Sequence, residues 1–324
     1  MGTSLRWSGV CNGAGAWRVV GALGVAVLLA VVVPAARPAS AAGVLQVDYA
    51  GSMGTVMDTV LGPAFAKAND VRYRGKGQGS YGLARLIAGR QLRPDVFVAI
   101  TPGPIRVVQQ AGLMAEALPV ASTRMVIAYS PKSRFAVEFA AAAAGRTPWY
   151  EVLQRKGLQF GRTDPLTDPQ GRNIVLTMQL AALFYGQPEL VARVLGAPVN
   201  PRQIFSEPSL LSRLEAGQVD AASGYRSAVV SHRLPYISLP DEIDLGDPAQ
   251  EKTWYVRAGF TLPGPAGKPV RVTVQPLVFY AGVLKDAANP RAAHAFVDYL
   301  RSAAGQKSFA AFGYDPPRGA ALVP

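Results

Sequence analysis

The stretch 44–81 reads VLQVDYA, GSMGT, a helical segment ending near Ala68, then VRYRGKGQ and GSYG. This order predicts a strand, a turn, a helix, a second strand and a second turn, which together form one α/β unit. Each turn carries a glycine–serine pair, Gly51-Ser52 and Gly79-Ser80, where a strand passes into a helix. The first N–H groups of a helix lack partners within the helix, and a serine hydroxyl is a further donor. Two such turns in one unit therefore predict a site for one small anion.

Length and composition favour a folded protein of two domains. The chain has 324 residues, of which 49% are hydrophobic and 17% charged, so a large core is expected. The formal net charge of +12 is scattered along the chain, without a run of five or six basic residues. Proteins that bind nucleic acid concentrate their basic residues on one element, so we expect no nucleic-acid partner. A basic surface that attracts small anions, or that faces an acidic envelope, fits the charge better.

Residues 1–42 have the pattern of a secretory signal peptide. Two arginines precede an apolar run over 19–33, which is shorter than the roughly 20 residues that a membrane-spanning helix needs. The following ARPASAAG supplies small residues for cleavage after Ala42, although an uncleaved anchor is the alternative. The only cysteine, Cys11, precedes the apolar run, so no lipoprotein attachment site follows it and the mature chain would contain no disulfide.

Strand and helix patterns alternate along the rest of the chain. We expect a buried strand over 95–100, a long helix over 171–185, one apolar strand over 271–284 interrupted by Pro276, and an amphipathic helical pair over 289–314. This alternation predicts largely parallel sheets covered by helices. Gly62-Pro63 should break or kink the first helix.

Signatures of catalysis are weak. The two histidines, His232 and His294, are far apart, and the chain has no HExxH, CxxC or histidine cluster. The motif GQGSYG is not a nucleophile elbow, because Gln78 stands where that turn needs a glycine. We therefore expect no catalytic residue, no metal site and no cofactor, with an exported enzyme or sensor domain on the same fold as the alternative.

Five segments together resemble the periplasmic substrate-binding proteins of ABC importers, specifically the molybdate/tungstate-binding group. They are AGSMGTVMDTVLGPAF (50–65), GQGSYGLARLIAGRQLRPDVFVAI (77–100), TDPLTDPQGR (163–172), SLLSRLEAGQVDAASGYRSAV (209–229) and NPRAAHAFVDYLRSAAGQKSFAAFGYDPP (289–317). The resemblance implies an α/β, two-lobed periplasmic-binding-protein fold (type II). Lobe 1 would comprise 43–125 and 273–324, lobe 2 would comprise 126–272, and two crossover strands would form the hinge beside a ligand cleft.

The resemblance also implies ligand-binding residues. Ser52 and Ser80 would bind ligand oxygens through their hydroxyls, helped by the N–H groups of Met53 and Tyr81. Tyr225 would point at the oxyanion. From lobe 2, the start of a helix would be offered by Gln170 or Gly171.

One position departs from the pattern of the group. The resemblance matches Asp168 to an aspartate that tungstate-binding members use as a metal ligand, together with a glutamate directly before the matched tyrosine. Gly224 stands at that second position, so we expect one carboxylate of the pair to be missing. Asp168 can instead cap the helix that begins near Gly171, or accept a hydrogen bond from a protonated oxyanion such as hydrogen phosphate. Glu207 is a weaker candidate for the same neighbourhood.

Three arginines flank the matched motifs, namely Arg162, Arg172 and Arg226. If one of them enters the cleft, a phosphate-type or carboxylate ligand gains weight, because arginine suits bidentate contact with such groups. The sequence thus predicts an extracytoplasmic, monomeric binding protein that captures a tetrahedral oxyanion for the permease of an ABC importer. Molybdate or tungstate is the first expectation, and phosphate, sulfate or a small carboxylate is the alternative.

Overall fold

The computed structural model describes residues 43–264 and 267–324. The predicted signal peptide, its cleavage site and Cys11 lie outside these residues. Within them, no helix combines the length and the apolar character needed to cross a membrane.

The strands are β1 (Val44–Ala50), β2 (Arg72–Gln78), β3 (Val96–Ile100), β4 (Leu118–Ser122), β5 (Met125–Tyr129), β6 (Phe160–Gly161), β7 (Ala221–Tyr225), β8 (Tyr236–Ser238), β9 (Gly259–Pro263), β10 (Pro269–Thr273) and β11 (Val278–Val283). The helical segments are η1 (Gly51–Met53), α1 (Gly54–Val56), η2 (Met57–Leu61), α2 (Gly62–Asn69), α3 (Ser80–Ala88), α4 (Pro102–Gln110), α5 (Ala136–Ala143), α6 (Trp149–Val152), α7 (Pro169–Phe184), α8 (Leu190–Leu195), α9 (Glu207–Ala216), α10 (Arg226–Ser231), η3 (Pro248–Gln250), η4 (Tyr255–Arg257), α11 (Pro290–Arg301) and α12 (Ala303–Ala311).

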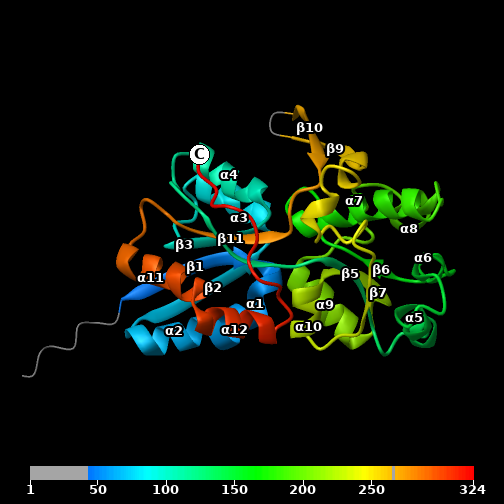
Figure 1. The fold of residues 1–324 in the computed structure, drawn as a ribbon, viewed down its shortest axis with the longest axis horizontal. Coiled ribbons are helices and arrows are strands. Elements are labelled where there is room, and N and C mark those ends of the chain that lie inside the picture. Colours follow the sequence, from blue (N-terminus) through cyan, green and yellow to red (C-terminus); the bar gives the residue numbers. More distant parts are fainter. Residues whose placement is uncertain (1–42, 265–266) are drawn as a thin grey trace, which may run out of the picture. The chain divides into compact units, whose positions relative to one another are not determined.

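The first sheet has the strand order β2-β1-β3-β11-β4 and is covered by helices on both faces (Figure 1). Alternation along β3 shows why both faces are buried. Val96, Val98 and Ile100 join the core beneath α2, α11 and α12, whereas Phe97 and Ala99 join the core beneath α3 and α4. A strand buried on both sides reads as a continuous apolar run, as VFVAI does.

The second sheet has the order β6-β7-β5-β8. Its strand β7 again separates two environments. Ser223 and Tyr225 face α7, where their hydroxyls meet Gln170 and Asn173. Ala222 packs on the opposite face with residues of α9 and α10, and the Cα of Gly224 also faces that side.

The chain passes from β4 in the first sheet to β5 in the second through Thr123 and Arg124. It returns between β10 and β11. The prediction of one long strand over 271–284 is therefore wrong, because Pro276 separates β10, which pairs with β9 in a hairpin, from β11. The sheets are also mixed rather than largely parallel, because β11 and β5 run antiparallel to their neighbours.

The first helix continues through Gly62-Pro63 instead of breaking there. The segment η2 before it is a π-helix, and Pro63 falls in the first turn of α2. A local widening to a π-turn removes the need for the hydrogen bond that a proline nitrogen cannot donate. The predicted break is thus replaced by a change of helical type.

Candidate functional site

The two glycine–serine turns lie side by side at the carboxyl ends of β1 and β2. The parallel register of these strands ends with the pair Ala50 and Gln78, and each turn follows directly. The side chains of Ser52 and Ser80 are 4% and 1% exposed. Their hydroxyls have no hydrogen-bond partner among the described residues, and neither hydroxyl caps the helix that it begins. The structure therefore brings together two buried donors that the fold itself does not use.

Other elements approach both turns closely at their glycines. A Cβ atom on Gly51 would lie 3.2 Å from Glu207 Oε2, and one on Gly79 would lie 3.2 Å from Asp168 Oδ2. Both distances are tighter than ordinary van der Waals contact. The turns of the first sheet thus face two carboxylates that come from α7 and α9.

Asp168 and Glu207 form a buried acidic pair held by Gln170. The Asp168 Oδ1 atom accepts from the backbone N–H of Gln170 at 2.9 Å, so the predicted helix cap is confirmed. The Gln170 Nε2 group donates to Glu207 Oε1 at 3.1 Å, and the Ser223 hydroxyl donates to Gln170 Oε1 at 3.0 Å. Gln170 therefore positions both carboxylates, a role that the sequence did not reveal.

Burial changes the proton affinity of this pair. It raises the pKa of Asp168 to about 6, with the Gln170 N–H opposing the rise and Asp164 adding to it. Burial, followed by the charge of Asp168, raises the pKa of Glu207 well above its usual value, against hydrogen bonds from the Ser52 backbone and from Gln170. Two carboxylates this close resist ionising together, so the pair retains a proton near neutral pH.

Gly224 supplies no carboxylate at the expected position, but a second carboxylate nevertheless lies beside Asp168. A side chain at Gly224 would point into the apolar core, where its Cβ would lie 2.7 Å from Val229 Cγ2. The second carboxylate comes from Glu207 at the start of α9 instead. Sequence reasoning underrated Glu207 because an acidic residue in a first helical turn is usually explained by the helix dipole alone.

Tyr225, at the end of β7, faces α7, the helix that Asp168 caps. Its side chain is fully buried and its hydroxyl oxygen accepts from Asn173 Nδ2 at 3.0 Å. Burial, then the charges of Asp168 and Glu207, raise the pKa of Tyr225 well above its usual value. The phenol therefore stays protonated and keeps its O–H as a donor. Asn173 is a further residue of the site that the sequence analysis missed.

The other predicted residues are placed differently. Met53 is fully buried, and its side chain belongs to the hydrophobic core. The ring of Tyr81 carries the guanidinium of Arg172 at 3.6 Å from its centroid. Gly171 packs against the backbone of residues 163–165, where a Cβ atom would lie 2.6 Å from Pro165 N. Met53 and Gly171 therefore offer no side chain to a ligand, and the Tyr81 side chain is stacked against Arg172.

Several helices start at this one place. η1 begins beside Ser52, α3 at Ser80, α7 directly after Asp168 and α9 at Glu207. Each start presents N–H groups and a partial positive charge. The centre of the site therefore combines donors and positive helix ends with two carboxylates that share a proton.

The three arginines that flank the matched motifs lie in different surroundings. Arg162 is buried away from the site and donates to the carbonyls of Ala197 and Pro198. Arg226 pairs with Asp315 at 3.1 Å near the crossover. Only Arg172 comes near the predicted residues, where burial lowers its pKa.

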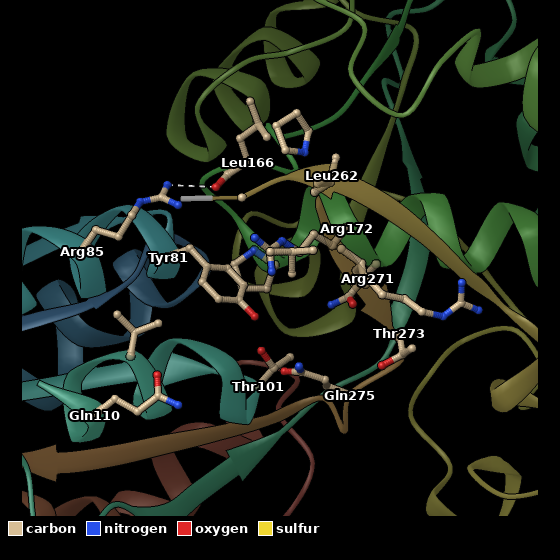
Figure 2. A pocket seen from close by; sticks show the side chains of 17 residues that line it. Tyr81, Arg85, Thr101, Gln110, Leu166, Arg172, Leu262, Arg271, Thr273 and Gln275 are labelled. Atoms are coloured by element: carbon tan, nitrogen blue, oxygen red, sulfur yellow. Dashed lines mark hydrogen bonds between the residues drawn. The ribbon is translucent and has the colours of Figure 1, made fainter. Parts of the chain in front are cut away.

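Two cavities flank the buried centre. The larger, about 750 Å³, lies beside Tyr81, Arg172 and the β9–β10 hairpin (Figure 2). The smaller, about 510 Å³, is lined by Gly79, Asp168 and Glu207, among others. Between them, the Gly82 N–H donates to the Thr167 carbonyl at 3.0 Å and Arg85 donates to the Leu166 carbonyl at 2.9 Å.

Known proteins share this sequence pattern. The model of the family described as bacterial extracellular solute-binding protein matches residues 45–315. The molybdate/tungstate-binding protein WtpA of Pyrococcus abyssi is 33% identical over 208 residues, which are 58% of each chain. A putative ABC transporter molybdenum-binding protein of Haloferax volcanii is 31% identical over 68% of each chain. The chain thus spans under two thirds of the length of WtpA.

Solved structures share the fold. The periplasmic molybdate-binding protein of Azotobacter vinelandii superposes with a TM-score of 0.60 at 15% identity, covering 85% of this chain and all of that one. The sulfate-binding protein SubI of Mycobacterium tuberculosis gives 0.53 at 16% identity, with 86% and 87% covered. The predicted two-lobed α/β fold is confirmed, and the match over 45–315 shows that the chain belongs to the family of bacterial extracellular solute-binding proteins.

Proposed function

We propose that this protein captures a tetrahedral oxyanion, molybdate or tungstate, and delivers it to the permease of an ABC importer. The observation that carries the proposal is the pair of buried, unpartnered hydroxyls of Ser52 and Ser80, in two turns whose glycines lie against the carboxylates of Glu207 and Asp168. Relatives named for molybdate and tungstate support the choice of anion.

The donors of the site suit a small oxyanion. Two serine hydroxyls, the Tyr225 O–H and the N–H groups at four helix starts can satisfy oxygens on several sides of the ion. Neutral dipoles can hold a buried dianion without the desolvation penalty of a buried cationic side chain. We include the N–H groups of Met53, Tyr81 and Gly171 among these donors.

The acidic pair supplies a basis for selecting the anion. With one proton shared between them, Asp168 and Glu207 keep one negative charge, which repels sulfate and phosphate. Neither sulfur nor phosphorus in these ions takes up further ligands that would offset this repulsion. The larger hexavalent molybdenum and tungsten centres can expand their coordination from four oxygens to six. Asp168 and Glu207 can then act as oxygen ligands once the proton leaves, so repulsion becomes attraction only for these metals.

Membership of the family makes the chain an extracytoplasmic solute-binding protein. We further propose a signal peptide over 1–42, a monomer, no turnover of the ligand, and closure of lobe 1 (43–125 and 273–324) onto lobe 2 (126–272) around the ion.

Titration calorimetry of the purified protein with tungstate, molybdate, sulfate and phosphate tests the proposal. We expect tungstate and molybdate to bind at one site per chain and at least ~100-fold more tightly than sulfate or phosphate, which corresponds to about 2.7 kcal/mol. In the Asp168→Asn/Glu207→Gln variant this preference should collapse. Equal affinity for all four anions, or no binding, would reject the proposal.

A further inference from the structure

The two cavities beside the site carry opposite charge. Among the described residues, those that line the larger cavity include Arg85, Arg172 and Arg271 and no acidic residue (Figure 2). Within 43–264 and 267–324, the residues that line the smaller cavity include Asp164, Asp168 and Glu207 and no lysine or arginine. An anion approaching the protein therefore meets attraction on one side of the buried centre and repulsion on the other.

The arginines of the larger cavity are not committed to carboxylates. Among the described residues, none of the three forms an ion pair. Arg85 and Arg271 are exposed, and the Arg85 guanidinium donates a hydrogen bond to the Leu166 carbonyl, which Figure 2 marks. Their charges are therefore available to an incoming anion.

The wall of this cavity is continuous with the proposed binding residues. Tyr81 follows Ser80 in α3, and Pro169 follows Asp168. Asn173 lines the cavity while its amide donates to the Tyr225 hydroxyl at 3.0 Å. The stacked Tyr81 and Arg172 side chains both line this cavity, and Tyr81 is the residue next to Ser80.

We infer that the larger cavity is the route by which a small inorganic dianion reaches the serine turns, and that it holds the ion transiently before burial. This inference rests on the proposed function. The Arg172 guanidinium, stacked on Tyr81, attracts the ion at the inner end, and Arg85 and Arg271 attract it at the mouth. The volume of about 750 Å³ far exceeds that of one oxyanion, so the ion arrives hydrated and loses its water farther in.

Stopped-flow fluorescence of tungstate binding tests the route. In Arg85→Gln/Arg271→Gln we expect the association rate constant to fall roughly 3- to 10-fold at about 20 mM salt, and the difference to nearly vanish at about 0.5 M. The dissociation rate constant should not change. The matched control is Arg146→Gln/Arg291→Gln, which removes the same charge from exposed positions outside both cavities. An equal loss in both variants, or no loss in the first, would overturn the inference.

A thiol measurement separates this inference from the proposed function, because it needs no oxyanion. Thr273→Cys places a thiol in the larger cavity and Leu86→Cys places one in the smaller, each in a Cys11→Ser background. At position 273, the anionic reagent sulfonatoethyl methanethiosulfonate should react faster than the cationic reagent trimethylammonioethyl methanethiosulfonate. At position 86, the anionic reagent should react more slowly than the cationic one. The same reactivity ratio at both positions would refute the charge asymmetry, whereas failure of tungstate to bind would refute the proposed function and the route with it.

Discussion

At the scale of single residues, the site is defined by polar atoms that the fold leaves without partners. A buried hydroxyl without a hydrogen bond lowers the stability of the folded protein. Ser52 and Ser80 therefore destabilise the ligand-free protein, and a ligand that accepts from them removes this effect. The same holds for two carboxylates placed together in a buried site. Both features make the ligand-free site less stable and the ligand-bound site more stable.

Replacing either serine by alanine should weaken tungstate binding by about 1–3 kcal/mol, because an oxygen of the buried ion loses its donor. Titration calorimetry measures the loss. Thr177→Val is the matched control, since the Thr177 hydroxyl is also buried and unpartnered but lies within α7. Unchanged affinity in both serine variants would show that the hydroxyls do not contact the ligand.

Asp168→Asn should stabilise the ligand-free protein above pH 6. The folded-state pKa of about 6 exceeds the ordinary value of 3.8, so the folded state holds the proton more tightly than the unfolded state. The free energy of unfolding of the wild type therefore falls as the pH rises from about 4 to 6. Asparagine can still accept from the Gln170 N–H but does not ionise. The variant should therefore avoid the fall of about 1–3 kcal/mol in the free energy of unfolding.

Urea unfolding between pH 4 and pH 8 measures this difference. We expect the Asp168→Asn variant to exceed the wild type in stability at pH 8 and to match it at pH 4. The control is Asp298→Asn, which makes the same substitution at an exposed position in α11. A variant that is less stable than the wild type at every pH would mean that the ionised carboxylate is a net stabilising cap.

At the scale of elements, α7 carries the acidic pair into place. Its first turn supplies the Asp168 cap and Gln170, and its next turn supplies Asn173. This turn fits against residues 163–165 only because residue 171 is a glycine. The glycine is therefore explained by close packing, a cause that leaves no trace in the hydrophobic pattern.

Gly171→Ala should destabilise the protein by about 1–3 kcal/mol and weaken tungstate binding, because the added methyl group meets backbone atoms that cannot move aside. Thermal unfolding and calorimetry measure the two effects. The control is Gly54→Ala in α1, where no atom lies within 4 Å of the added Cβ and φ is −49°. That change should be neutral or stabilising by about 0.5–1 kcal/mol. Equal effects of both changes would remove the packing explanation.

At the scale of the whole molecule, ligand binding and the closed arrangement are expected to depend on each other. Contacts join elements of the two sheets around the site. The Gly82 N–H donates to the Thr167 carbonyl at 3.0 Å, and Thr55 Oγ1 lies 3.1 Å from His232 Nε2. An ion held by Ser52, Ser80, Asp168 and Glu207 would add bonds across the same boundary.

Tungstate should therefore raise the melting temperature. At 100 times the dissociation constant, linkage gives about 2.7 kcal/mol of stabilisation. Differential scanning calorimetry measures the shift, with sulfate at the same concentration and the Asp168→Asn/Glu207→Gln variant as controls. A shift of equal size with sulfate would point to general anion binding on the basic surface instead.

The sequence by itself determined the order of the elements, the two serine turns and their adjacency, because these depend on local hydrophobic patterns and on the ends of neighbouring parallel strands. Only the tertiary structure decided that Glu207 is the second carboxylate, that Gln170 holds the pair, and that Gly224 faces an apolar core. Glu207 and Asp168 are 39 positions apart and meet through the packing of α7 and α9 around β7. No local pattern encodes such a meeting, because it depends on which face of β7 each helix covers.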